Sequence, residues 1–447
     1  MKAIRAGKIV SLLLCGVLSL AILEQAVYEE ERITDIAIDR VGQPQEGSGT
    51  ASDPYAIGTL EELLWFSREV NGGSSSLCGV LTADIDLGDQ AWVPIGKELA
   101  PFSGVFDGNG YAIYGLNIND NDNRLGFFGV TVDGRIKNLI VRGKIAGNES
   151  VGGLIGSMSG GTVEHCSFHG TISGRNMTGG IVGKLNGGSV QACYNTADIK
   201  TQTNNKTSIV SVGGIVGYAG TASVITDCYN TGQVTGTGRY SSNLDIDVGG
   251  IAGLICEQTE LSNCYNIGMV TNNDVAISPS MFQLGGIVGD APDSTVTNCY
   301  YLLTGVLTAR GVGSRDDVSG STNAVSLPGS LNAERLNGNR EVGTVWQRNA
   351  IVNRPMLTEN MEIHTVIVEM DSPEAGTVIM TSDTDQKYGY EQIYPTASFI
   401  TITAVAKEGY SFKEWQVDGL PISTEEQVTL IVSGNRTYIG VFEEISE

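Results

Sequence analysis

The stretch Val151–Met177, VGGLIGSMSGGTVEHCSFHGTISGRNM, is one copy of a pattern that occurs five times in this chain. Each copy starts with a glycine pair in an apolar segment and reaches a cysteine 14 or 15 residues after the first glycine. The five copies begin with VGGLIG at Val151, TGGIVG at Thr178, VGGIVG at Val212, VGGIAG at Val248 and LGGIVG at Leu284. A period of 27 to 36 residues is typical of proteins in which each repeat packs on its neighbours.

The shortest copy predicts the shape of one repeat. Its segments GGIVGKL, SVQACYN and ADIK alternate apolar residues with small or polar ones, which predicts three short strands separated by turns. Such a repeat fits one coil of a parallel β-solenoid, with coils about 4.8 Å apart. We attribute the glycine pair to a corner with positive φ and to close approach of the neighbouring chain. A phosphate-binding loop is disfavoured, because GGIVGK lacks the Ser or Thr hydroxyl of that motif.

The repeat cysteines are expected to stack in one column, because identical positions superpose in an in-register solenoid. They are Cys166, Cys193, Cys228, Cys264 and Cys299. Three states of these cysteines remain possible from the sequence: buried thiols, local disulfides or metal ligands. Disulfides are included because the spacing between coils lies within the range that a disulfide tolerates. Leu139 occupies the equivalent position of an earlier coil, which favours buried thiols. Without a Cys-x-x-Cys pair, a zinc site is disfavoured.

A second column is predicted from the tyrosines that follow three of these cysteines, Tyr194, Tyr229 and Tyr265. If the cysteines point inward, the tyrosines point outward. Exposed tyrosines would form a possible ligand stripe for a sugar or a protein. The alternative is a tyrosine stack that only stabilises the coils.

Candidate catalytic chemistry is sparse. Asp84 and Asp86 share one face of a predicted strand, and Asp107 lies in a DGNG turn, but glycoside cleavage needs two carboxyls at a defined separation. His165 and His169 flank Cys166 without a carboxylate at a fitting spacing. We therefore predict no catalytic residue, no metal site and no cofactor, with a polysaccharide-active enzyme as the leading alternative.

The N-terminal residues predict export. Residues 1–21 combine three basic residues with an apolar run and small residues near its end, as in a signal peptide or an uncleaved anchor. Membrane contact is expected only through this segment. The net charge of −23 disfavours nucleic acid as a partner. The predicted location is extracellular, at the cell surface.

The remaining chain divides into a linker, a repeat domain and a small module. Residues 22–46 are the linker, residues 47–358 the capped solenoid, and residues 362–445 a β-rich, β-grasp-like module. A helix capped by Thr59, with Glu62 completing a capping box, is expected to cover the first coil. Its predicted apolar stripe is Leu60, Leu63, Leu64 and Val70. The segment from Ser330 is expected to close the far end.

The repeat domain resembles bacterial surface proteins that carry GLUG motifs. The resemblance rests on DPYAIGTLEELLWFSREVN, ADIDLGDQAWVPIG and FSGVFDGNGYAIYGL, and on the alternation of Gly-Gly with Cys-Tyr-Asn. The C-terminal module is similar to internalin B-repeat-like modules through AGTV, GYSFKEW and YIGVFEE.

These resemblances imply a surface or adhesion role without an active site. Some GLUG-bearing proteins are attached to peptidases, but the His-Glu-x-x-His zinc motif is absent from this sequence. We therefore expect a non-catalytic, adhesin-like display rod that binds an extracellular glycan or protein. A purely structural envelope protein is the second alternative.

Overall fold

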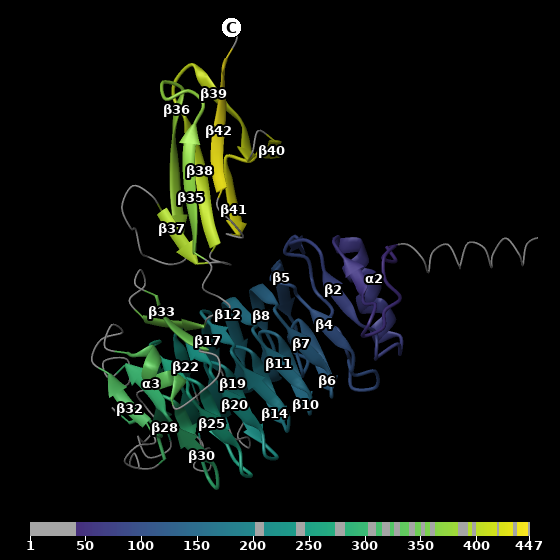
Figure 1. Cartoon of the computed structure of the whole chain (residues 1–447), viewed down its shortest axis with the longest axis vertical. Coiled ribbons are helices and arrows are strands. Elements are labelled where there is room, and N and C mark those ends of the chain that lie inside the picture. The colour runs from purple at the N-terminus through teal and green to yellow at the C-terminus, as the bar shows by residue number, and fades with distance from the viewer. Residues whose placement is uncertain are drawn as a thin grey trace, which may run out of the picture.

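The chain forms a parallel β-solenoid followed by a separate β module (Figure 1). The structure is a computed structural model, and it describes residues 42–201, 210–237, 246–272, 282–302, 310–314, 322–325, 331–338, 345–349, 354–357, 363–382, 392–395, 399–417, 420–431 and 436–445. The predicted signal segment lies outside these residues, as does most of the predicted linker. Among the described residues, no helix is both long and apolar enough to span a bilayer.

Four sheets build the solenoid. The nine-stranded sheet contains β1 (Tyr55–Ile57), β2 (Gly79–Leu81), β4 (Val105–Asp107), β7 (Arg135–Lys137), β11 (Thr162–Glu164), β15 (Ser189–Gln191), β20 (Val224–Thr226), β25 (Glu260–Ser262) and β30 (Thr295–Thr297). The six-stranded sheet contains β6 (Phe128–Val132), β10 (Ile155–Ser159), β14 (Val182–Asn186), β19 (Val216–Gly220), β24 (Ala252–Ile255) and β29 (Val288–Asp290). The five-stranded sheet contains β9 (Glu149–Gly152), β13 (Asn176–Gly179), β18 (Val210–Gly213), β23 (Ile246–Gly249) and β28 (Phe282–Gly285).

The fourth, 12-stranded sheet has one strand per coil at its start and then divides into two branches. Its first strands are β3 (Ile85–Asp86), β5 (Ala112–Asn119), β8 (Ile140–Ala146) and β12 (Ser167–Gly174). One branch continues through β16 (Tyr194–Asn195), β21 (Tyr229–Asn230), β26 (Tyr265–Asn266), β31 (Cys299–Leu302) and β32 (Thr322–Val325). The other continues through β17 (Asp198–Thr201), β22 (Val234–Gly236) and β27 (Val270–Asn272).

The predicted solenoid and its register are confirmed. Val151 pairs with Thr178, and the same position continues through Val212, Val248 and Leu284. The expectation of three strands per coil is wrong, because each predicted strand containing Gly-Gly or Ala-Cys divides at a bend. The residue before each cysteine adopts positive φ, for example 54° at His165 and 50° at Ala192. This left-handed residue turns the chain between two sheets.

The glycine pairs serve the close approach of neighbouring chain and not positive φ. Gly179 and Gly180 are absent from the residues with positive φ. A Cβ at Gly180 would overlap the carbonyl oxygen of Gly214 and the side chain of Asn195. Only glycine leaves room for the next coil there.

The predicted N-terminal helix and its capping box are confirmed. The helix is α2 (Leu60–Asn71). The Thr59 hydroxyl accepts from the Glu62 amide, and the Glu62 carboxylate accepts from the Thr59 amide. Its buried face contains Leu63, Trp65, Phe66 and Val70, whereas Leu64 is exposed. Phe66 packs on Phe106 of β4, with ring centroids 5.6 Å apart. The helix therefore covers the first coils.

A short segment before the module lies on the flank of the solenoid. We call residues 331–338, 345–349 and 354–357 the strap; it contains α3 (Ala333–Asn337) and the antiparallel pair β33 (Trp346–Asn349) and β34 (Arg354–Leu357). Its buried side chains pack against tyrosines of several successive coils. The predicted end cap is therefore a side cover, because its apolar residues meet the outer face of β21 and β26.

The C-terminal module consists of two sheets. One contains β37 (Gln392–Pro395), β35 (Ile363–Met370), β42 (Arg436–Glu444), β39 (Tyr410–Val417) and β40 (Leu420–Ser423). The other contains β36 (Gly376–Ser382), β38 (Phe399–Ala406) and β41 (Gln427–Ile431). The first and last strands, β35 and β42, lie parallel side by side. The core of the module contains Ile400, Ile402 and Trp415.

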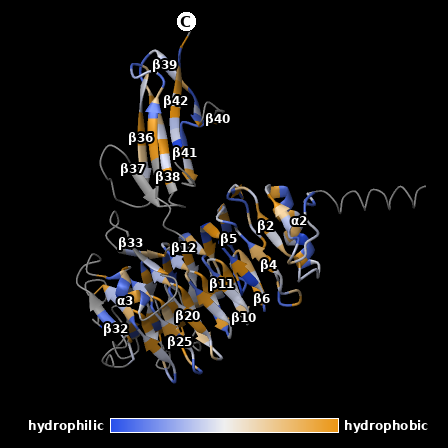
Figure 2. Cartoon of the chain, viewed as in Figure 1, coloured by the Kyte–Doolittle hydropathy of each residue, from blue (hydrophilic) through white to orange (hydrophobic). Residues whose placement is uncertain are grey.

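The core of the solenoid runs continuously through the coils. Apolar residues alternate with polar ones along the strands, as Figure 2 shows by the mixed colours of each strand. The inward residues of successive coils form one cluster, from Ile57 in β1 to Val312 beyond β31. Each coil thus buries its apolar face against its neighbours.

Candidate functional site

The tyrosine column is present, but the exposure expected of a ligand stripe is not found. The rings of Tyr194, Tyr229 and Tyr265 stack in parallel, with centroids 4.9 and 5.0 Å apart. Their exposed fractions are 8%, 1% and 0%. Trp346 of the strap lies against the column, 5.4 Å from the Tyr265 ring, and the Tyr265 hydroxyl donates to the Pro355 carbonyl at 2.7 Å. The chain itself therefore occupies the surface that a ligand would need.

The cysteine column consists of buried free thiols, one of the three alternatives left open by the sequence. Each thiol donates to the carbonyl two residues earlier, as Cys228 does to Thr226 at 3.2 Å. Burial raises the pKa of Cys193, Cys228, Cys264 and Cys299 well above the ordinary value. These thiols therefore stay protonated and unreactive at neutral pH.

An asparagine ladder, which the sequence reasoning missed, runs beside the tyrosines. Asn195 donates to the Asn230 side chain at 2.7 Å, and Asn230 donates to Asn266 at 2.8 Å. All three are fully buried. The Cys-Tyr-Asn phrase itself was the available signal, because a buried amide at the same position of successive coils comes within hydrogen-bond reach of its own copies.

The two histidines that flank Cys166 do not lie on one regular strand. His165 lies at a corner with positive φ, whereas His169 lies within β12, so the regular strand that would place both on one face is absent. The His169 ring contacts Ser167 Oγ at 3.1 Å and Thr196 Oγ1 at 2.8 Å. Within the described ranges, no group of three or more His, Cys, Asp or Glu side chains is arranged to hold a metal ion.

Acid sensitivity is expected from His169. Burial, and then the charge of Arg142, lower its pKa from 6.5 to about 3. Between these pH values the unfolded chain binds a proton that the folded chain does not, so stability falls as pH falls. The slope is at most about 1.4 kcal/mol per pH unit. The free energy of unfolding, measured in urea at pH 5.0 to 7.0, should change less steeply with pH for His169→Gln than for the native chain. Equal pH dependence in the two proteins would contradict this assignment.

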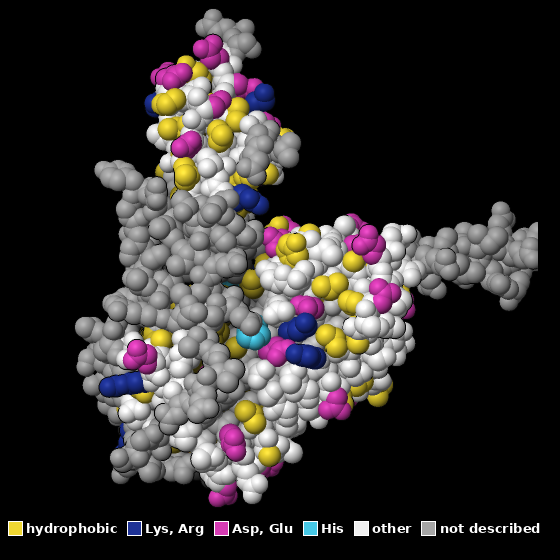
Figure 3. Space-filling view, in the orientation of Figure 1, with side chains coloured by type: hydrophobic (Ala, Val, Ile, Leu, Met, Phe, Trp, Pro, Cys, Tyr) yellow, Lys and Arg dark blue, Asp and Glu magenta, His cyan; other side chains and the backbone are white. Residues whose placement is uncertain are grey.

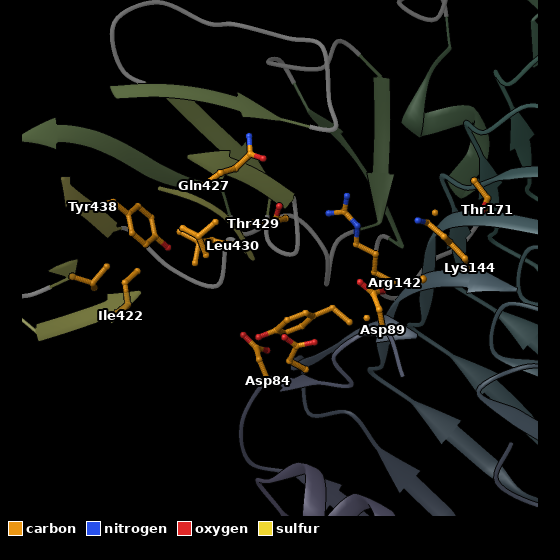
Figure 4. A pocket seen from close by; sticks show the side chains of 17 residues that line it. Asp84, Asp89, Arg142, Lys144, Thr171, Ile422, Gln427, Thr429, Leu430 and Tyr438 are labelled. Carbon is orange, nitrogen blue, oxygen red and sulfur yellow. The ribbon is translucent and has the colours of Figure 1, made fainter. Parts of the chain in front are cut away.

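A cavity of about 690 Å³ lies between the solenoid and the module, and we call it the module cleft. Its solenoid wall comes from β3, β5, β8, β12 and the turn after β3, and its module wall from β39, β40, β41 and β42 (Figure 4). The labelled side chains of Asp84, Arg142 and Lys144 gather on the solenoid side, opposite Leu430 and Tyr438 of the module. The cleft thus joins two parts of the chain that are distant in sequence.

The acidic wall of the module cleft contains Asp84, Asp86 and Asp89. Asp84 and Asp86 flank the buried Ile85, so both lie on the outer side of β3, as the alternation predicts. Desolvation raises the pKa of Asp84, opposed by the Ala112 amide that donates to its carboxylate at 2.8 Å. Asp86 accepts from the Gly88 amide at 2.7 Å. Backbone donors therefore hold both carboxylates in place.

Basic and aromatic side chains complete the cleft. Arg142 and Lys144 point outward from β8, and Lys144 is in register with Thr171 of β12. Tyr114 is paired with Asp86, and desolvation followed by the charges of Asp86 and Asp84 raises its pKa. Tyr438 is buried, and desolvation raises its pKa despite the opposing charge of Arg436. The cleft therefore offers hydrogen-bond acceptors, donors and ring faces together.

The third carboxylate weighed from the sequence has a structural role. Asp107 binds Lys137 at 2.7 Å and accepts from the Asn138 side chain at 3.0 Å. Burial alone would raise its pKa, but these partners lower it below the ordinary value. Arg135 and Glu164 form a similar pair on neighbouring coils. Figure 3 shows acidic and basic side chains side by side on this flank.

The comparisons with known proteins agree with the resemblance seen in the sequence. Residues 147–173 and 210–235 match the GLUG motif, and residues 375–446 match the divergent InlB B-repeat domain. The chain carries GLUG motifs and a divergent InlB B-repeat domain. The matched GLUG segments contain whole coil strands, including β10 and β11 in the first and β19 to β21 in the second. The InlB B-repeat match contains the strands that form the module wall of the cleft.

Two curated relatives match short parts of the chain. The "Putative Gly-rich membrane protein" of Evansella cellulosilytica is 37% identical over 102 residues, which are 22% of this chain and 12% of that protein. Halomucin of Haloquadratum walsbyi is 31% identical over 123 residues, which are 24% of this chain and 1% of halomucin. The chain therefore spans a small fraction of the length of the curated relatives it matches.

Solved structures show a partial likeness. A crystal structure described as a "putative immunoglobulin A1 protease" from Bacteroides ovatus has 19% identity and a TM-score of 0.47, over 70% of this chain and 95% of that one. A structure described as "IgA1 Protease" has 15% identity and a TM-score of 0.41, over 60% of this chain and 21% of that one.

Proposed function

We propose that this chain is a cell-surface repeat protein that binds a glycan in the module cleft without cleaving it. The cleft carries the proposal, because it combines Asp84 and Asp86, which accept hydrogen bonds, with Arg142 and Lys144, which donate them. A sugar hydroxyl both donates and accepts, so adjacent hydroxyls can use both kinds of group. Tyr114 supplies a ring beside them.

The surface location has separate support. The GLUG segments resemble those of surface proteins, and one curated relative is named as a membrane protein. The signal-like residues 1–21 agree with export.

A glycan array with the purified full chain tests the proposal. We expect saturable retention on one glycan class, without shortening of the glycan. The double variant Asp84→Asn/Asp86→Asn should reduce the affinity at least tenfold, because hydroxyl donors lose charged acceptors. Lys144→Ala should reduce it less, since Arg142 remains.

Glu260→Gln is the matched control. Glu260 is an exposed carboxylate of β25, on another sheet of the solenoid and outside the cleft lining. Its substitution removes one charge and should leave retention unchanged. Retention that is equal in the Asp84→Asn/Asp86→Asn variant and the native chain would place the ligand elsewhere. No retention on any glycan of the array would favour a purely structural role.

A polysaccharide-active enzyme is the second candidate, favoured by one observation. The fold places the basic residues Arg142 and Lys144 in the same cleft as Asp84 and Asp86. The raised pKa of Asp84 also suits a proton donor. Chromatography of the glycans after incubation decides between the two candidates, because an enzyme shortens the chains that a binder returns intact.

A further inference from the structure

A second cavity of about 470 Å³ lies beside the module cleft, and we call it the distal groove. It lies between the segment around Trp92 and the turn that follows β5. The exposed side chains of Asn119, Asp120 and Asp122 line it. A bidentate ion pair between Arg124 and Glu98, at 3.1 Å, spans its rim. The lining therefore combines carboxylates, amides and one ion pair with apolar residues such as Trp92 and Pro94.

The two cavities lie along one strand and meet at a shared wall. Tyr114 and Gly115 of β5 line the module cleft, while Asn117 and Asn119 of the same strand line the distal groove. Asn117 donates to the carbonyl of Asp89, which itself lines the module cleft, at 2.9 Å. From Tyr114 to Asn119 the strand advances about 16 Å. A ligand that fills both cavities must therefore be an extended chain.

The side chains that line the two cavities favour a carbohydrate chain over a peptide as the ligand. β5 pairs with β8 on one side, and on the other it is bridged by β3 at Ile113 and Tyr114 and by Ala91 at Asn117, so it leaves no long, continuous edge to which a peptide strand could add. Recognition along β5 therefore depends on side chains, mainly carboxylates and amides that accept from hydroxyls. The chain carries a net charge of −23, which disfavours a polyanion.

We infer that the ligand is a neutral, linear polysaccharide that runs along β5 and fills the module cleft and the distal groove together. This inference rests on the proposed glycan function and adds the length and charge class of the ligand. The module cleft holds one part of the polymer, and the hydroxyls of its continuation bind Asn119 and Asp122.

Titration of the full chain with neutral oligosaccharides of increasing length tests this inference. The probes are cello-, xylo- and N-acetylchito-oligosaccharides of two to eight units, with hyaluronan oligosaccharides as an anionic series and extended peptides as a separate series. In one neutral series we expect the affinity to rise at least tenfold from the dimer to the hexamer. The anionic series should bind more weakly at every length.

Two variants locate the second half of the ligand. Asn119→Ala/Asp122→Ala should abolish the gain with length and leave the dimer affinity unchanged, because both side chains are exposed and lie outside the module cleft. Ala91→Tyr, which places a ring in the distal groove, should do the same. Asp84→Asn/Asp86→Asn should weaken binding at every length.

The outcomes separate the inference from the proposed function. Equal affinity for dimers and hexamers would overturn the two-cavity ligand while leaving a glycan-binding cleft. Tightest binding in the hyaluronan series would overturn the neutral class. Binding of peptides with no response to any oligosaccharide would overturn both proposals.

Discussion

Replacing Trp346 by alanine is expected to destabilise the coils under the strap by about 3 to 5 kcal/mol. The indole is 1% exposed and packs on Tyr229 and Tyr265, with ring centroids 6.1 and 5.4 Å away. Its Nε1 donates to the Asp227 carboxylate at 2.9 Å. The substitution therefore removes an aromatic cover and a hydrogen bond to a charged group at once.

Hydrogen exchange is the suitable measurement, because a solenoid unfolds locally as well as globally. The amides of Tyr229 and Tyr265 donate to Cys193 and Cys228 of the preceding coils, and their exchange should accelerate more than a hundredfold. Trp346→Phe is the matched control, since it keeps a ring over the column and loses only the indole donor. It should cost about 1 to 2 kcal/mol. Unchanged exchange in the alanine variant would show that the strap adds nothing to these coils.

Replacing Gly214 by alanine is expected to lower the free energy of unfolding of the solenoid by about 3 kcal/mol. A Cβ at this position would overlap the carbonyl oxygen of Gly250 in the next coil. It would also press on the Asn230 side chain, which donates to Gly232 and Asn266 at 2.8 Å. The clash therefore separates two coils and disturbs the asparagine ladder together.

The matched control for this substitution is Gly72→Ala. Gly72 follows α2 with φ of −81°, and a Cβ there would lie 3.1 Å from the Arg68 carbonyl oxygen. This glycine lies in the ordinary helical region, so alanine should change stability by less than about 1 kcal/mol. Thermal unfolding followed by circular dichroism compares the two variants. An equal midpoint for both would refute the role of glycine in coil spacing.

The regular part of the fold was predictable because it repeats. Once Val151 and Thr178 were aligned, the inward position of Cys166 and the equivalence of Leu139 followed from spacing. The capping box at Thr59 was also predictable, because it joins residues only three positions apart. The number of strands per coil was missed, although His, Asp or Asn, the types that favour positive φ, precedes four of the five cysteines and only Ala192 departs from this pattern.

Less of the candidate site was predictable. Alternation about Ile85 placed Asp84 and Asp86 on one outer face, but nothing in their neighbourhood indicated Arg142 or Lys144. Those two residues reach the cleft because a later coil stacks on β5. Tyr438 carried no signal at all, because its place in the cleft depends on how the module lies on the solenoid.

The sequence by itself determined the coil register, the inward cysteines, the outward tyrosines and the capping helix, because each follows from local spacing repeated along the chain. Tertiary structure decided what the outward tyrosines meet and which side chains line the module cleft. The Trp346–Asp227 hydrogen bond joins residues 119 positions apart, and the module cleft joins β3 to β42. Contacts of that range have no periodicity to reveal them. The tyrosine surface considered as a possible ligand stripe is therefore covered by the chain, and the module cleft is the site that we propose instead.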